Sequence, residues 1–334
     1  MFVGKQSISF ETPPCIVSCA SIVGKKEAEG PLGSYFDIIE EDPTIGNENW
    51  EKAESALQKK AAILALEKAG LKPAEIRYLF SGDLLGQIIA SSFGMLELNI
   101  PMFGLYGACS TCGEALSLAA MTVAAGYADH CLAVTSSHFA SAEKQFRYPL
   151  EYASQRPLST TWTVTGSGAF IVGKTGRVKI TGITTGKMVD YGVKDSMNMG
   201  AAMAPAAADT IYQHFTDFHR TPDDYDLIVT GDLGVVGREL LFDLLRQKDF
   251  HLAEKYFDCG IAIFDDAKQD THSGGSGCGC SAVTLAGYLI PKLKTGELKR
   301  ILFLPTGALL STVSFNEGQS IPGICHGVVL EHSS

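Results

Sequence analysis

The chain has 334 residues, enough for one large α/β unit or for two lobes of roughly 150 residues each. Hydrophobic residues make up 46% of it and charged residues 19%, which is a globular composition and not a disordered one. The formal charge of -10 without any basic run argues against nucleic-acid binding, and the absence of a leader or an apolar stretch of about 18 residues argues against secretion and against a membrane span.

The first half of the chain reads as alternating helices and strands. Apolar residues recur every three to four positions over residues 50–69, and Gly70 ends that helix. A strand over residues 76–80 leads into the turn Gly82-Asp83-Leu84, and a small-residue helix follows Cys109. Two further strands, over residues 131–134 and 166–172, are expected to close this half.

The second half repeats this order. A helix expected from Pro205 precedes a strand over residues 227–229 and the turn Gly231-Asp232-Leu233, which matches the earlier turn. A small-residue helix after Gly277 then precedes a strand over residues 301–304. The tripeptide match alone could be chance, but its agreement with the order of elements predicts two similar βαβαβ lobes, residues 1–175 and 176–334, that share a site where matching strand ends converge.

Two polar segments do not fit the repeat, residues 24–49 and 137–163. Long irregular connections are uncommon without a role, so both could cover a site or form a subunit contact. Plain surface loops are the other interpretation.

Cys109 lies at the start of the small-residue helix. Free backbone amides and the positive end of the helix dipole favour a thiolate there, and a thiolate can attack a carbonyl. A buried structural cysteine is the alternative, because free cysteines are among the most buried residues. The nine cysteines, with no secretion signal, indicate a reducing compartment.

The repeat, the length and several segments resemble the thiolase superfamily, which includes the ketoacyl synthases. The resemblance covers nearly the whole chain and implies a five-layered αβαβα sandwich, with Cys109 at the nucleophile position and a homodimer formed through first-half strands. The segments that carry it are Gly107–Ala115, Gly166–Val172, Gly277–Ala282 and Gly318–Gly327.

A narrower resemblance links the chain to a family of sporulation proteins of spore-forming bacteria, through residues 107–114, 156–162 and 273–280. It implies a protein that takes part in moving dipicolinic acid, pyridine-2,6-dicarboxylate, into the developing spore. It also implies a cytoplasmic protein, peripheral on the forespore or spore inner membrane, that acts with membrane-embedded proteins of the same sporulation operon.

The superfamily's catalytic partners are missing from the positions that match. The usual Gly-His pair falls near Gly275-Ser276, so serine stands where histidine is expected, and the second-half strand end that carries an asparagine carries Asp232 instead. A carboxylate cannot act as a positive oxyanion partner. The sequence therefore favours a protein that binds a ligand, with an acyltransferase that uses Cys109 as nucleophile, or a scaffold with an empty pocket, as alternatives.

We expect the ligand site to use residues from both lobes. Asp83 and Asp232 end equivalent strands and are expected to face one cavity with Cys109 and with His138, a protonated histidine that could hold a carboxylate. The second-half helix start completes the predicted set with Ser276 and Cys278. No metal ligands are predicted, although the two aspartates could share a Ca²⁺ that enters with the chelating ligand.

Other sequence patterns give weaker indications of function. The CxxC from Cys109 to Cys112 lacks the thioredoxin context, the Cys278 and Cys280 pair has no second CxxC for zinc, and the glycines do not form a dinucleotide fingerprint. Lys144, Arg147 and Arg156 form a sparse cationic group that is typical of a solvated face, although it could steer a ligand.

Overall fold

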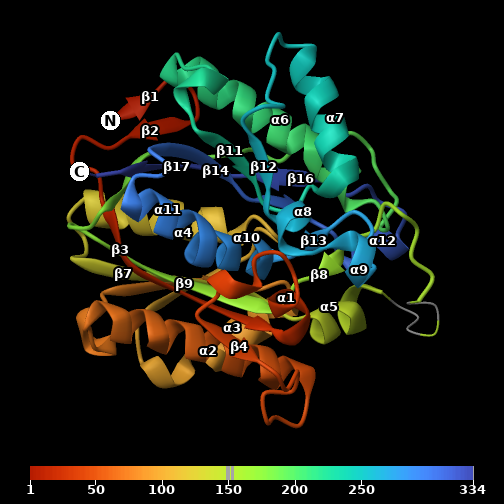
Figure 1. Cartoon of the computed structure of the whole chain (residues 1–334), viewed down its shortest axis with the longest axis horizontal. Coiled ribbons are helices and arrows are strands. Elements are labelled where there is room, and N and C mark those ends of the chain that lie inside the picture. Colours follow the sequence, from red (N-terminus) through yellow and green to blue (C-terminus); the bar gives the residue numbers. More distant parts are fainter. Residues whose placement is uncertain (148–150, 152–153, 334) are drawn as a thin grey trace.

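A computed structural model describes residues 1–147, 151 and 154–333 of the chain. Figure 1 shows layers of helices and strands that alternate from its lower to its upper edge. Part of the segment 137–163 lies outside the described residues. Within the part of the chain that is described, none of the helices combines the length and the apolarity needed to cross a bilayer.

The first-half strands form one sheet in the order β6-β5-β7-β9-β3. β5 is parallel to β6 and to β7, whereas β9 is antiparallel to β7 and to β3. The bounds of these strands are Cys15–Gly24 for β3, Tyr78–Gly82 for β5, Met102–Leu105 for β6, His130–Ser137 for β7 and Gly166–Gly173 for β9.

The second-half strands repeat this arrangement in the order β12-β11-β14-β17-β10. β11 is parallel to β12 and β14, and β17 is antiparallel to β14 and β10, so each strand has a counterpart in the first sheet. Two residues of β10 pair with β3, which joins the two sheets into one continuous path. The bounds are Val178–Thr184 for β10, Leu227–Thr230 for β11, Tyr256–Asp258 for β12, Arg300–Leu304 for β14 and Gly327–His332 for β17.

The helices form three layers around the two sheets. α2 contacts the first sheet from outside, α6 and α7 cover the second, and α4 and α10 lie between the sheets (Figure 1). This is the five-layered αβαβα arrangement that the sequence predicted. The bounds are Trp50–Ala69 for α2, Ile89–Gly94 for α3, Thr111–Ala124 for α4, Met199–Phe218 for α6, Gly234–Arg246 for α7 and Cys278–Thr284 for α10.

The predicted helix bounds are correct for α2 and wrong for α6. In α2 the side chain of Asn49 accepts from the amide of Lys52, and Gly70 ends the helix in the left-handed conformation. α6 begins at Met199 and not at Pro205, because Asn198 caps it and an alanine-rich run carries the helix through the proline. Proline removes only one hydrogen-bond donor in a helix that is otherwise buried.

Short elements frame the junction between the lobes on one side of the molecule. Strand β8 pairs in parallel with β13, and β15 pairs antiparallel with β16. Their bounds, with those of the other short elements, are Phe2–Val3 for β1, Ser7–Ser9 for β2, Lys25–Ala28 for α1, Ile38–Glu40 for β4, Phe139–Phe146 for α5, Trp162–Thr163 for β8, Cys259–Ile263 for α8, Asp266–Gln269 for α9, Gly275–Ser276 for β13, Ile290–Thr295 for α11, Thr306–Ala308 for β15, Thr312–Asn316 for α12 and Gly323–Cys325 for β16.

Candidate functional site

Cys109 lies on a tight elbow between β6 and α4. The preceding residue, Ala108, has φ of 49°, a left-handed conformation that costs energy for any residue with a side chain. The hydroxyl of Thr111 stabilises the elbow, since it donates to the carbonyl of Ala108 at 2.6 Å and accepts from the amide of Gly107 at 3.0 Å. The elbow holds the Cys109 side chain in a cavity between the two lobes.

Asp232 follows β11 and enters the same cavity from the second lobe. One carboxylate oxygen accepts from the backbone amide of Gly277 at 2.9 Å, and the other accepts from the hydroxyl of Thr306 at 3.0 Å. Burial raises the pKa of Asp232 to about 7, although the hydrogen bonds from Cys109 and Gly277 oppose the rise. Near neutral pH this carboxyl group therefore exists in both protonation states.

The surroundings of Cys109 work against the thiolate that is expected at the helix start. Burial raises the pKa of Cys109 well above its ordinary value, and the negative charge of Asp232 raises it further. A hydrogen bond from the amide of Gly277 lowers it only in part. Desolvation and a like charge thus outweigh the helix dipole.

The cavity has a volume of about 90 Å³ and is lined by residues of both lobes. Of the six residues predicted for the ligand site, it brings together Cys109, Asp232 and Ser276. None of the described residues that line it is a histidine or a lysine. The other lining residues are Leu84, Tyr106, Ala108, Ala142, Glu143, Phe146, Arg147, Thr160, Thr161, Thr163, Ser196, Met197, Met199, Met203, Ala308 and Leu310.

Asp83 does not reach this cavity, so the two equivalent aspartates do not share one site. Its carboxylate accepts from the amides of Leu85 and Ser91, both at 2.8 Å, and from the Ser91 hydroxyl at 2.6 Å. These bonds stabilise the turn that follows β5. Burial raises the pKa of Asp83 against the effect of these donors.

His138 and Cys278 also lie outside the cavity. His138 caps α5, with Nδ1 accepting from the amide of Ala140 at 3.2 Å and Nε2 lying 2.8 Å from the carbonyl of Pro43. Both ring nitrogens are thus engaged away from the cavity, and burial lowers the pKa of His138, which disfavours the protonated form that we expected to hold a carboxylate. The thiol of Cys278 donates to the carbonyl of Ser136 at 2.9 Å, within the wall behind Cys109.

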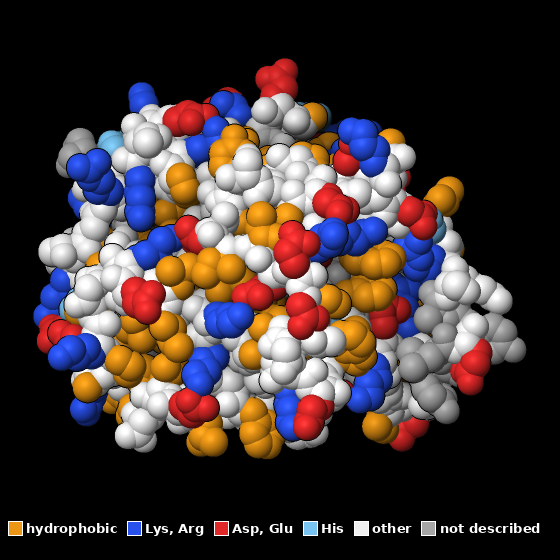
Figure 2. Space-filling view, turned by 60° about the horizontal axis from the view of Figure 1, so that its bottom comes forward, with side chains coloured by type: hydrophobic (Ala, Val, Ile, Leu, Met, Phe, Trp, Pro, Cys, Tyr) orange, Lys and Arg blue, Asp and Glu red, His pale blue; other side chains and the backbone are white. Residues whose placement is uncertain are grey.

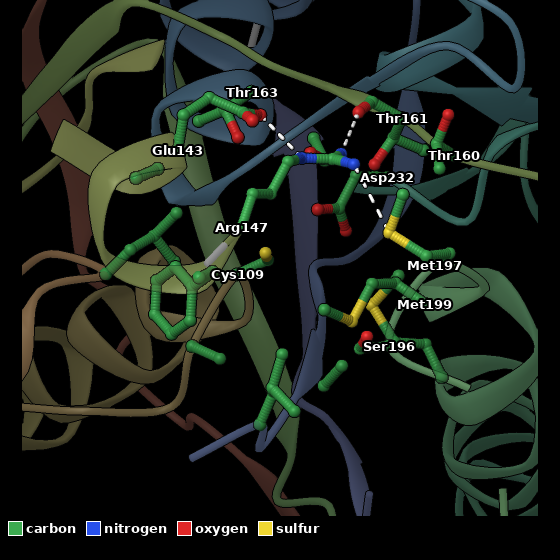
Figure 3. Close-up of a pocket in the computed structure, with 18 of the residues that line it drawn as sticks. Cys109, Glu143, Arg147, Thr160, Thr161, Thr163, Ser196, Met197, Met199 and Asp232 are labelled. Atoms are coloured by element: carbon green, nitrogen blue, oxygen red, sulfur yellow. Dashed lines mark hydrogen bonds and ion pairs between the residues drawn. The ribbon is translucent and has the colours of Figure 1, made fainter. Parts of the chain in front are cut away.

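The cation of the cavity is Arg147, which the sequence placed in a sparse surface group. Figure 3 shows its side chain reaching from the end of α5 across the cavity. Its Nε donates to Glu143 at 2.6 Å, one terminal nitrogen donates to the carbonyl of Thr161 at 3.0 Å, and the other lies 3.5 Å from the sulfur of Met197. Burial raises the pKa of Glu143, with Arg147 opposing the rise.

The aspartates are not arranged to hold a metal ion. Within the described ranges, no group of three or more His, Cys, Asp and Glu side chains could ligate one. The carboxylate oxygens of Asp83 and Asp232 already accept hydrogen bonds from amides and hydroxyls. Asp83 lies in the turn after β5, whereas Asp232 lies in the cavity. The structure thus does not provide the shared Ca²⁺ site that the sequence suggested.

Comparison with known proteins identifies the family. The family described as Stage V sporulation protein AD (SpoVAD) matches residues 4–331. Stage V sporulation protein AD of Bacillus subtilis (strain 168) is 45% identical over 331 residues, which cover 99% of this chain and 98% of that protein.

Solved structures with the same fold include condensing enzymes. The 3-oxoacyl-[acyl-carrier-protein] synthase III from Aquifex aeolicus VF5 is 15% identical, with a TM-score of 0.57 over 96% of this chain and 100% of that one. A substituted OleA from Xanthomonas campestris is also 15% identical, with a TM-score of 0.59 over 97% of this chain and 100% of the other. At this identity the likeness shows a thiolase-like fold.

Proposed function

Because this chain belongs to the stage V sporulation protein AD family, we propose that it acts in sporulation by binding dipicolinic acid for uptake into the developing spore. The proposed site is the cavity at Cys109. The observation that carries the proposal is the position of the Arg147 guanidinium, which is largely buried in this cavity among apolar and hydroxyl side chains. The described lining of the cavity contains no imidazole that could activate the thiol.

Arg147 retains hydrogen-bond donors for a carboxylate. A guanidinium carries five N–H groups, and three of them are used on Glu143, Thr161 and Met197. One N–H is left on each terminal nitrogen, and the sulfur of Met197 is a weak acceptor that an anion would replace. Paired donors on one guanidinium match the two oxygens of a carboxylate.

The rest of the cavity suits the second carboxylate and the ring. Protonated Asp232 can donate to a carboxylate, and so can the hydroxyls of Thr163 and Ser276. Leu84, Phe146 and the nearby methionines supply apolar surface for a flat ring. Dipicolinate is larger than the enclosed space, so Met197 and Met199, which are flexible, are expected to re-pack on binding.

Calorimetric titration of dipicolinate into the full chain tests the proposal. We expect saturable binding, with loss of binding in Cys109→Phe, which fills the cavity, and unchanged binding in Lys144→Ala, which lies on the exposed side of α5. Thermal unfolding of each variant verifies that it is folded. The titration is repeated with calcium and with a chelator to decide whether calcium enters with the ligand, and absence of binding in both conditions would refute the proposal.

An acyltransferase that uses Cys109 is the second candidate, favoured by the strained elbow that presents the thiol. Transfer of an acyl group to sulfur needs a thiolate or a base to take the proton, and the raised pKa of Cys109 works against the first. We therefore expect mass spectrometry to find no acyl adduct on Cys109 after incubation with acyl-coenzyme A at neutral pH. A stoichiometric adduct that disappears in Cys109→Ala would establish the enzyme instead.

We also propose a homodimer formed through the first-half sheet. β6 is the last strand of that sheet, and Phe103 within it is 53% exposed, while Phe93 in α3 is 67% exposed and Leu96 is 71% exposed. Pairing of two β6 strands across a twofold axis would cover this apolar edge.

Phe103→Lys is expected to convert the dimer to a monomer, which light scattering measures as a halved mass. Val313→Lys, which changes an apolar residue on α12 that is 65% exposed, is expected to leave the mass unchanged. A dimer that survives in Phe103→Lys would place the subunit contact elsewhere.

Family membership supports a role in sporulation. We propose that the protein lies peripherally, on the cytoplasmic side, at the forespore or spore inner membrane and acts with membrane-embedded proteins of its operon. Fractionation of sporulating cells with and without those proteins tests this. The chain should shift from the membrane fraction to the supernatant when they are removed, and an unchanged distribution would count against it.

A further inference from the structure

A second cleft, of about 600 Å³, lies beside α5. The segments 24–49 and 137–163, which do not fit the repeat, supply most of its lining. Its aromatic walls are formed by Trp50, Phe139 and Trp162. Pro43 and Ile45 add aliphatic surface. The segments that the sequence left unassigned thus meet around one feature of the surface.

The cleft is separate from the dipicolinate cavity, although the two share walls. Phe139 at the start of α5 lines the cleft, whereas Glu143, one turn later, lines the cavity. In β8 the side chain of Trp162 lines the cleft and that of Thr163 lines the cavity, as expected for neighbours in a strand.

The aromatic walls are held in place from within. The ring of Phe139 stacks on Trp162 with centroids 4.0 Å apart, and the ammonium of Lys26 lies 4.1 Å from the Trp162 ring. Lys26 also donates to the carbonyl of Gln269 at 2.6 Å. Arg156 lies 5.1 Å from the same ring and pairs with Asp270, so both cations near this wall are already engaged and the wall is formed without a partner.

Acidic side chains form the rim. Glu29, Glu40, Glu41 and Asp42 line the cleft, against Lys25 and Lys26, and Glu40 is also paired with Lys60 at 2.7 Å. Glu41 pairs with Lys25 at 3.5 Å, and both side chains are more than 60% exposed, so this pair is weak. The rim is thus net negative over an apolar floor, on the side of the molecule where α2 and β4 lie and where Figure 2 shows hydrophobic side chains among charged ones.

We propose that this cleft binds a segment of a partner protein that carries lysine or arginine beside aromatic or aliphatic side chains. The apolar side chains would pack against Trp50, Pro43 and Ile45, and the cations would face Glu29 and Glu41. Preformed aromatic pockets with a charged rim of opposite sign are typical of peptide recognition. Binding of such a segment does not depend on the ligand of the neighbouring cavity.

Tryptophan fluorescence measures occupancy directly, because the chain has only two tryptophans and both line the cleft. The probe is the blocked peptide Lys-Phe-Lys-Leu-Lys-Phe, which lacks tryptophan, with Glu-Phe-Glu-Leu-Glu-Phe as its matched control. We expect a saturable change in emission with the basic peptide at millimolar concentration or below, and none with the acidic peptide.

Charge reversal on the rim tests the assignment. The affinity for the basic peptide is expected to fall roughly tenfold in a Glu29→Lys, Glu41→Lys double variant. It should stay unchanged in Glu254→Lys, an exposed position outside the cleft. Equal binding of both peptides, no change in emission with either, or equal affinity in the double variant would overturn the proposal. So would a change in emission with protein concentration alone, which would assign the cleft to a second copy of the chain.

Discussion

Replacing Arg147 with alanine is expected to weaken dipicolinate binding roughly a hundredfold in calorimetric titration, because truncation of one partner of a buried charge pair costs about 2–4 kcal/mol. Arg147→Lys, which keeps the charge but loses the paired donors, should recover only part of the affinity. Glu143 would then lose its partner, and its pKa, already raised by burial, would rise further.

The matched control is Lys144→Ala, on the same helix, whose ammonium pairs with Glu51 at 2.7 Å away from the cavity. It should bind dipicolinate as the parent chain does. If Arg147→Ala unfolds at the same temperature as the parent and binds equally well, Arg147 is not the anchor of the carboxylate.

Replacing Asp232 with asparagine is expected to stabilise the protein by about 4 kcal/mol at pH 8 and by little at pH 4. Burial raises the pKa of Asp232 from its ordinary value to about 7, so the folded state holds a proton that the unfolded chain releases at lower pH. The stability of the parent chain therefore falls as the pH rises from 4 through 7, and asparagine, which does not ionise, escapes that loss. Denaturant unfolding at the two pH values measures the difference.

Ligand affinity should depend on pH through the same residue. If only protonated Asp232 accepts the dianion, the affinity of the parent chain should fall about tenfold between pH 6 and pH 8, around the pKa of about 7. In Asp232→Asn it should be nearly constant. A parallel fall in both proteins would show that a different group controls binding.

The sequence predicted the repeat because strand order and turn residues are local patterns. The turns at Gly82 and Gly231 match, and β5 and β11, which precede them, occupy the same place in the two sheets. The contacts made after each turn differ, and they decide the role of its aspartate. Asp83 is bonded to Ser91, which comes shortly after it, whereas Asp232 is bonded to Gly277 and Thr306 from distant segments.

The role of Arg147 could not be predicted from its neighbours in sequence. A glutamate four residues before an arginine on a helix is a frequent surface pair, and nothing in that spacing indicates burial. Burial depends on the apolar face of α5, with Ala142 and Phe146, and on contacts from Thr161 and Met197. The sequence feature that indicates burial is the amphipathic pattern of residues 139–146, which places Glu143 and Phe146 on one side of the helix.

The most direct test of the proposed ligand site is a crystal structure of the full chain with dipicolinate. We predict a carboxylate on the terminal nitrogens of Arg147, the ring beside Cys109 and no bond between ligand and sulfur. Dipicolinate bound elsewhere while this cavity stays empty, or an acyl group attached to Cys109, would contradict a ligand site at this position.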